Sequence, residues 1–108
     1  MSEKTFLDEA ETALAAIETA MDRLNDEDVI DVECKRSGNV LEIEFIDNGS
    51  KIIVNTQAAM QELWVAAKSG GFHYKQVDGK WTNTRDGSEL FAALSALASA
   101  QGGADVFL

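Results

Sequence analysis

The chain has 108 residues, the length of one domain, and folding at this size removes roughly 60 to 70% of the unfolded chain's surface from water. Hydrophobic residues make up 45% of the chain, a share that excludes a disordered acidic polypeptide. The net charge of -10 argues against nucleic acid as a partner, because phosphate backbones are bound by Lys and Arg. We therefore expect one globular domain over residues 1–108.

The sequence carries no signal for a membrane or for a disulfide. No apolar run approaches the roughly 20 residues that cross a bilayer, and the start, Met1 to Lys4, lacks the basic-then-apolar order of a signal peptide. We expect a soluble, cytoplasmic protein with no membrane partner. The one cysteine, Cys34, excludes an internal disulfide, a two-cysteine metal or redox motif and a cluster held by several thiolates.

The first predicted element is a helix from about Thr5 to Leu24, with one acidic edge. Apolar residues recur there at spacings of three and four, which is typical of one buried helical face. At about 100° per residue, four acids fall within one sector turned away from the apolar stripe. These acids are Asp8, Glu11, Glu18 and Asp22. Residues 1–33 hold eleven acids and two bases, a balance of -9, whereas residues 34–108 carry only -1.

Three strands are predicted next, because the apolar spacing changes from three or four to two. Ile30, Val32 and Cys34 alternate with charged residues, which indicates a strand with one wet face. A turn at residues 37–39 leads to a second strand over residues 41–45. Asn48-Gly49 is the strongest hairpin signal in the chain, and a β-branched third strand follows over residues 51–55.

The segment from Gln57 to Lys68 is ambiguous. Its apolar residues have helical spacing, yet its centre could equally form a strand, and the local pattern alone slightly favours a helix. Gly70-Gly71 ends this segment. Two short strands, residues 72–77 and 80–84, are predicted after it, joined at Asp78-Gly79.

A second helix is expected after these strands, with Asp86 or Ser88 as its N-cap and Gly102-Gly103 as its end. The residues expected to face the core are Leu90, Phe91, Leu94, Leu97 and Ala98. The apolar tail, residues 105–108, is expected to dock on the domain. The order of helix, hairpin-linked strands and helix predicts an α+β two-layer sandwich, an antiparallel sheet of five to six strands with both terminal helices packed on one face.

The sequence resembles the frataxin family, and in particular its bacterial members, over essentially its whole length. Each matching motif is weak evidence alone, but the order and spacing of the motifs together are highly specific. The motifs are Ile17-Glu18 with Asp22, Ile30-Asp31, Asn48 to Asn55 with Gln57, Leu63 to Ala66 with Lys68, Gly70 to Tyr74, and Trp81.

The resemblance implies a fold and a function. It makes the stretch around Trp64 a strand, which overrules the slight local preference for a helix. Frataxins bind iron on an acidic ridge along the first helix and first strand, and an overlapping surface binds the cysteine desulfurase of iron–sulfur cluster assembly. We therefore expect an iron donor or sensor that regulates this desulfurase and meets the scaffold machinery, mostly monomeric, with an iron-dependent oligomer left open.

The candidate metal ligands are the carboxylates of this ridge. Position for position, the resemblance gives Glu18, Asp22, Asp31 and Glu33, with Asp26 and Asp28 in the intervening loop. The chain departs from related bacterial sequences at Leu7, Thr19 and Arg23, where a His or further acids are common, and Asp8 and Glu11 are expected to compensate in part.

Carboxylates are hard ligands, so we expect ferrous or ferric iron to bind weakly, and calcium, magnesium or manganese are not excluded. Counting from Asp26 puts Ile30 and Ser37 at ligand positions of an EF-hand, which excludes that motif. The alternative is that the acids form only a solvated helix face, the usual role of a charge run.

The predicted partner-binding residues are Glu18, Asp22, Asn55, Gln57 and Trp64. A tryptophan in an unknown domain is more often part of the core, but in frataxins the matching residue projects from the sheet toward partners. His73 is expected on the sheet face opposite Phe72 and Tyr74, as a surface or structural residue, and Cys34 as an inert thiol in the core.

No arrangement of nucleophile and base, phosphate loop or nucleotide fingerprint is present, so we expect no catalytic site and no enzyme. Two alternatives stay open. One is a protein–protein modulator of the assembly machinery in which metal binding is incidental, and the other is a weak oxidase acting on ferrous iron.

Overall fold

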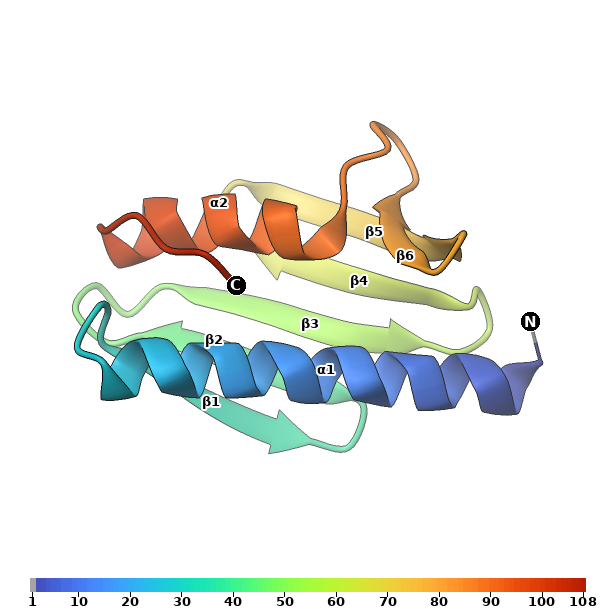
Figure 1. Cartoon of the computed structure of the whole chain (residues 1–108), viewed down its shortest axis with the longest axis horizontal. Coiled ribbons are helices and arrows are strands. Elements are labelled where there is room, and N and C mark those ends of the chain that lie inside the picture. The colour runs from blue at the N-terminus through green and yellow to red at the C-terminus, as the bar shows by residue number, and fades with distance from the viewer. Residues whose placement is uncertain (1) are drawn as a thin grey trace.

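The computed structural model describes residues 2–108 as two helices on one face of a six-stranded sheet (Figure 1). This is the α+β sandwich that the sequence predicted. The elements are α1 (Glu3–Asp26), β1 (Val32–Ser37), β2 (Val40–Phe45), β3 (Lys51–Gln57), β4 (Glu62–Ala67), β5 (Gly70–Val77), β6 (Lys80–Asn83) and α2 (Leu90–Gly102).

The sheet is a meander in which the strands lie in chain order and each neighbouring pair is antiparallel. Tight turns make this order possible. At the predicted Asn48-Gly49 turn, Gly49 has a φ of 72°, which a glycine adopts without steric cost. Its amide donates to the carbonyl of Phe45 at 2.8 Å and closes the turn between β2 and β3.

Helix α1 forms because its apolar residues make one continuous stripe, and that stripe is buried against the sheet. Ser2 caps the helix by accepting a hydrogen bond from the amide of Thr5 at 3.1 Å. The buried stripe consists of Phe6, Ala10, Ala13, Leu14, Ile17, Met21 and Leu24. Within residues 2–108, no helix has both the length and the hydropathy needed to cross a membrane.

Strand β4 resolves the ambiguous segment, and the slight local preference for a helix there is wrong. Leu63 and Val65 are buried toward the helices, whereas Trp64 between them points to the other face. β4 is hydrogen-bonded on both sides, to β3 and β5. Pairing with two strands outweighs the helical spacing of a short segment, as the resemblance implied.

Helix α2 buries Leu90, Leu94 and Ala98, and Phe91 and Leu97 are half-buried at its flanks. Its N-cap is Glu89, so the prediction of Asp86 or Ser88 is wrong. The Glu89 carboxylate accepts from the amides of Phe91 and Ala92 at 2.7 and 3.0 Å.

Asp86 is not free to cap α2, because it closes a local turn. Its Oδ1 accepts from the amide and the hydroxyl of Ser88, at 2.8 and 2.6 Å. The chain after α2 docks in part, as expected. Val106 is buried and its amide donates to Ser99 Oγ at 2.9 Å, while Phe107 is exposed.

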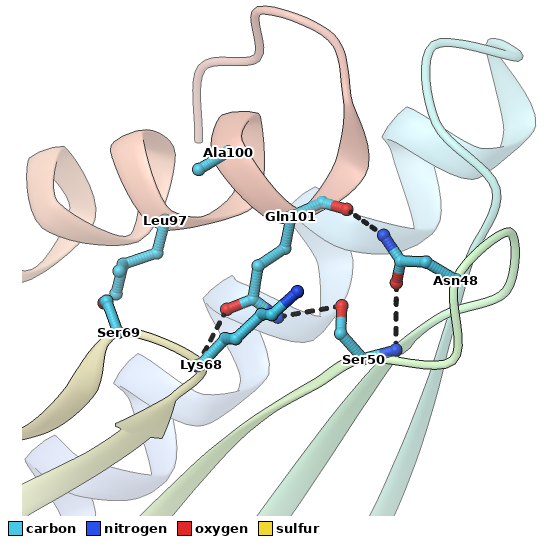
Figure 2. Close-up of a pocket in the computed structure, with 7 residues that line it drawn as sticks. All are labelled: Asn48, Ser50, Lys68, Ser69, Leu97, Ala100 and Gln101. Atoms are coloured by element: carbon cyan, nitrogen blue, oxygen red, sulfur yellow. Dashed lines mark hydrogen bonds between the residues drawn. The ribbon is translucent and has the colours of Figure 1, made fainter.

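A buried glutamine at the end of α2 ties the helix to two turns of the sheet, as Figure 2 shows. Gln101 Nε2 donates to Ser50 Oγ at 3.0 Å and to the carbonyl of Lys51 at 3.2 Å, and its Oε1 accepts from the amide of Lys68 at 3.1 Å. The Gln101 carbonyl accepts from Asn48 Nδ2 at 2.7 Å. One side chain thus satisfies groups from both turns, a role that its apolar surroundings in the sequence did not signal.

We expect Gln101→Leu to lower the free energy of unfolding by about 1 to 3 kcal/mol, because it leaves the part-buried amide of Lys68 and carbonyl of Lys51 without this partner. Denaturant unfolding monitored by circular dichroism measures the loss. Ala92→Ser, an exposed change on the same helix, is the control and should cost about 0.5 kcal/mol or less. An equal, small effect of both changes would contradict the role of Gln101.

Candidate functional site

Helix α1 runs antiparallel beside β1, the edge strand of the sheet (Figure 1). Glu11 forms an ion pair with Arg36 near the end of β1. Asn25 lies near the start of β1, where its Oδ1 accepts from the amide of Val32 at 3.2 Å. The part of α1 between these two contacts therefore lies beside the middle of β1.

Cys34 marks where carboxylates of the two elements converge. Burial, together with the smaller effect of the nearby charges of Asp22, Glu18 and Glu33, raises the pKa of its thiol to about 12. The charges act this way because a thiolate would add another negative charge beside them. The thiol is half-buried at the margin of the core rather than within it, and its raised pKa keeps it protonated at neutral pH; its inertness stays a prediction.

The predicted metal ligands do not all share one surface. Seven are exposed and Glu18 is half-buried. Glu33 alternates with the inward-facing Val32 and Cys34, so it projects on the sheet face opposite α1. Glu33 also lies directly across from Glu44 of β2, a like-charge pair. The eight residues are Asp8, Glu11, Glu18, Asp22, Asp26, Asp28, Asp31 and Glu33, and we call them the acidic ridge.

The ridge gains an acid that sequence reasoning missed. A polar hollow at the end of α1 is lined by Asn25, Asp28, Asp31 and Asp47, with residues 102–104 on its other side. Asp47 follows β2 in a turn, and only the pairing of β1 with β2 brings it to this loop. In the part of the chain that the structure describes, no three His, Cys, Asp or Glu side chains lie close enough to hold one metal ion.

The second candidate surface is the face of the sheet that the helices leave open. Trp64 lies on it and is half-buried. Its indole ring stacks on the imidazole of His73, directly across in β5, with 4.3 Å between ring centroids and 5° between planes. As predicted, His73 lies on the face opposite Phe72 and Tyr74, and it is exposed.

Asn55 and Gln57, the two predicted partner-binding residues with amide side chains, lie beside the stacked rings of Trp64 and His73. Asn55 of β3 lies directly across from Trp64, and Gln57 Nε2 donates to Asn55 Oδ1 at 2.9 Å. The structure therefore brings Asn55, Gln57 and Trp64 to one surface. Glu18 and Asp22 belong to α1 on the other face of the sheet, so the predicted partner-binding residues form two groups.

Trp81, in contrast, is a core residue. It is buried and its ring meets Phe6 of α1 edge to face, with centroids 6.0 Å apart. The two tryptophans thus differ in environment although both lie in strands. Alternation within each strand decides the difference, because Trp81 points toward the helices and Trp64 points away from them.

Comparison with known proteins shows the family. A model of the frataxin-like domain matches residues 1–104, and the chain belongs to the frataxin-like family. It is 66% identical over 108 residues to an iron–sulfur cluster assembly protein CyaY of Janthinobacterium sp. (strain Marseille), covering all of this chain and 96% of the relative. It is 63% identical, with the same coverage, to the protein of that name from Herminiimonas arsenicoxydans.

Solved structures agree with the fold. A frataxin from Psychromonas ingrahamii superposes with a TM-score of 0.86 at 31% identity, covering 99% of this chain and 97% of the other. The trimeric frataxin of Saccharomyces cerevisiae, solved in complex with ferrous iron, superposes with a TM-score of 0.74 at 22% identity, covering 88% and 86%. The second likeness shows the shared fold alone.

We expect Cys34 to react slowly with iodoacetamide at pH 8, because its thiolate is rare well below a pKa of about 12. Glu18→Gln/Asp22→Asn should speed the labelling, since removing two of the nearby charges lowers the pKa. Mass spectrometry of timed samples measures the rate. Asp78→Asn/Asp86→Asn, which removes two exposed charges elsewhere, is the matched control, and equal rates in the two double variants would show that α1 does not act on Cys34.

Proposed function

We propose that this protein acts in iron–sulfur cluster assembly as a weak iron binder that regulates the cysteine desulfurase, serving as an iron donor or sensor. The acidic ridge holds the iron, and the ridge together with the Trp64 face meets the assembly machinery. Membership of the frataxin-like family supports the proposal, as do the names of the relatives from Janthinobacterium and Herminiimonas.

The observation that carries the proposal is the alignment of α1 beside β1. It places the acids of the helix and of the loop before β1 along one edge of the molecule, where Glu18 and Asp22 stand one helical turn apart, while Glu33 of β1 projects on the opposite sheet face. Exposed carboxylates in a row raise the local concentration of cations by their combined field. Because each carboxylate stays hydrated, iron should bind weakly, at several positions and with little selectivity.

The ridge is not uniform along its length. The ion pair with Arg36 already offsets the charge of Glu11, so this end offers less to a cation. At the other end Asp28, Asp31 and Asp47 line one polar hollow, and among residues 2–108 no positively charged side chain lines it. We therefore place the tighter binding at the end formed by Asp22 and this hollow.

Ferrous iron added to the protein without oxygen should first broaden the backbone amide signals of residues 18–33 and of Asp47, with His73 unaffected. Two-dimensional NMR of the labelled protein measures the effect, and calcium serves as a diamagnetic probe. Binding should weaken as salt rises from 0.05 to 0.3 M, values chosen so that the screening length falls from about 14 Å to about 6 Å.

The matched pair of variants separates the ridge from general charge. Glu18→Gln/Asp22→Asn should weaken the response to iron, whereas Asp78→Asn/Asp86→Asn, with the same change in net charge, should leave it intact. Signals that shift chiefly around His73 and Cys34, with α1 unchanged, would place iron elsewhere and overturn the ridge assignment.

The open sheet face favours a second candidate, a protein–protein modulator for which metal binding is incidental. Trp64, Asn55 and Gln57 form a surface of one aromatic ring and two amides, and tryptophan is among the residues enriched in contact hot spots. If iron and the desulfurase perturb separate residues in NMR titrations, and ridge variants bind the desulfurase normally, this candidate replaces the first.

We expect Trp64→Ala to weaken desulfurase binding by about tenfold or more. It should lower the free energy of unfolding by less than about 3 kcal/mol, the lower end of the loss expected when a core tryptophan is replaced by alanine. Trp81→Ala is the matched control, with the opposite pattern: a large loss of stability and normal binding per folded molecule. Binding assays beside thermal melts distinguish the two. Collapse of the Trp64→Ala fold with intact binding would contradict the contact role.

A further inference from the structure

Glu62 is a buried carboxylate on the face of the sheet opposite α1 and α2 (Figure 1). It begins β4, and alternation places it on the same open face as Trp64. It is only 4% exposed, although the neighbouring positions on this face are open to solvent or half-buried. A buried carboxylate is costly unless its charge is paired and hydrogen-bonded, so its surroundings must supply donors.

Three side chains of the open face surround this carboxylate, one by a hydrogen bond and two within ion-pair distance. The indole Nε1–H of Trp64 donates to Glu62 Oε1 at 2.8 Å. His73 Nδ1 lies 3.4 Å from the same oxygen, and Lys75 Nζ lies 3.9 Å from Oε2. His73 and Lys75 both project from β5 beside β4. The indole, the imidazole and the ammonium group together cover the Glu62 carboxylate.

We propose that Glu62 is a positioning residue that fixes the Trp64 side chain for contact with a protein partner. The carboxylate accepts a hydrogen bond from the indole N–H and attracts His73, which stacks on the indole ring. The hydrogen bond and the stacking together favour one orientation of the Trp64 side chain. The partner role of Trp64 is the part of the proposed function on which this inference rests. Trp64 and His73 would form the contact surface, and Glu62 would act from beneath it.

Geometry explains why positioning Trp64 in this way requires a carboxylate at position 62. The indole nitrogen can only donate, and it requires an acceptor. One carboxylate oxygen can accept from the indole and from His73 together while the second oxygen faces Lys75. A glutamine could keep the bond to the indole through its amide oxygen but would lose the attraction for Lys75. An apolar residue of similar length would lose every one of these contacts.

Ordering Trp64 before the partner arrives should strengthen binding, because a side chain that is already fixed does not lose its freedom on association. Without Glu62 we expect desulfurase binding about two- to tenfold weaker, the change that corresponds to ordering one large side chain. The effect should appear mainly as faster dissociation, as most changes at an interface do.

The first test reads the indole directly and needs no partner. Glu62→Met should move the Nε1–H NMR signal of Trp64 toward that of a solvent-exposed indole, and the ring should become more mobile in fluorescence anisotropy measured with Trp81→Phe as background. Glu62→Gln should keep most of the wild-type signal, because its amide oxygen still accepts. Trp64→Phe assigns the signal by removing it.

Glu44→Met is the matched control, the same change on the same sheet face but in β2, where Glu44 pairs with Lys51 and Glu33 rather than with Trp64. It should leave the Trp64 signal unchanged. Hydrogen exchange of the wild-type indole gives a reading that does not depend on any variant folding. Exchange as fast as in free tryptophan, or an unchanged signal in folded Glu62→Met, would overturn the positioning role.

The second test measures desulfurase binding of Glu62→Met, Glu62→Gln, Glu44→Met and Trp64→Ala. Weaker binding by Glu62→Met alongside Trp64→Ala, with Glu62→Gln close to wild type, supports the proposal. If Trp64→Ala binds normally, the partner role of Trp64 is wrong, and the positioning of the indole is still decided by the first test. If Trp64→Ala binds weakly but Glu62→Met binds like wild type, the positioning does not serve the partner and the inference fails.

Discussion

The packing of the α1 apolar stripe on one face of the sheet determines most of what this protein can present to its surroundings. The stripe fixes the rotation of the helix, and the contacts of Glu11 with Arg36 and of Asn25 with Val32 fix its register beside β1. Rotation and register together place Glu18 and Asp22 next to Cys34. A helix rotated by one residue would turn these acids about 100° away from the edge strand.

Placing both helices on one face also leaves the other face of the sheet uncovered, and this gives the protein two distinct surfaces. The acidic ridge lies along the β1 edge, and the Trp64 stack lies on β4 and β5. Three strand spacings separate β1 from β4, a distance of about 14 Å across the sheet. A partner that touches both surfaces must therefore reach around the β1 edge and across β2 and β3.

The elements and their order could be predicted from the sequence because each depends on local periodicity or turn chemistry. Asn48-Gly49 marked its hairpin, and the spacing of apolar residues marked both helices. β4 was harder, since its apolar residues fit a helix as well as a strand and only pairing with β3 and β5 decides between them.

The polar details of the structure were not predictable in this way. Folding brings together the hydrogen-bond partners of Gln101, Glu62 and Glu89. No local sequence pattern predicts a buried amide, a buried carboxylate or a glutamate at the N-cap. Of the candidate site, the acids of α1 could be predicted to share one edge because helical geometry is regular. Their approach to β1, and the addition of Asp47, depend on the register of the sheet.

The two ends of the sheet have a further consequence for the behaviour of the protein at high concentration. A strand at the end of a sheet has unpaired backbone groups that another copy of the chain could extend. At one end β1 carries Glu33 and Lys35 outward and lies beside the acids of α1, so a second copy would bring equal charge against it. At the other end β6 is only four residues long and leads directly into the loop before α2. The same carboxylates that are proposed to attract cations therefore also oppose strand-to-strand aggregation of the protein.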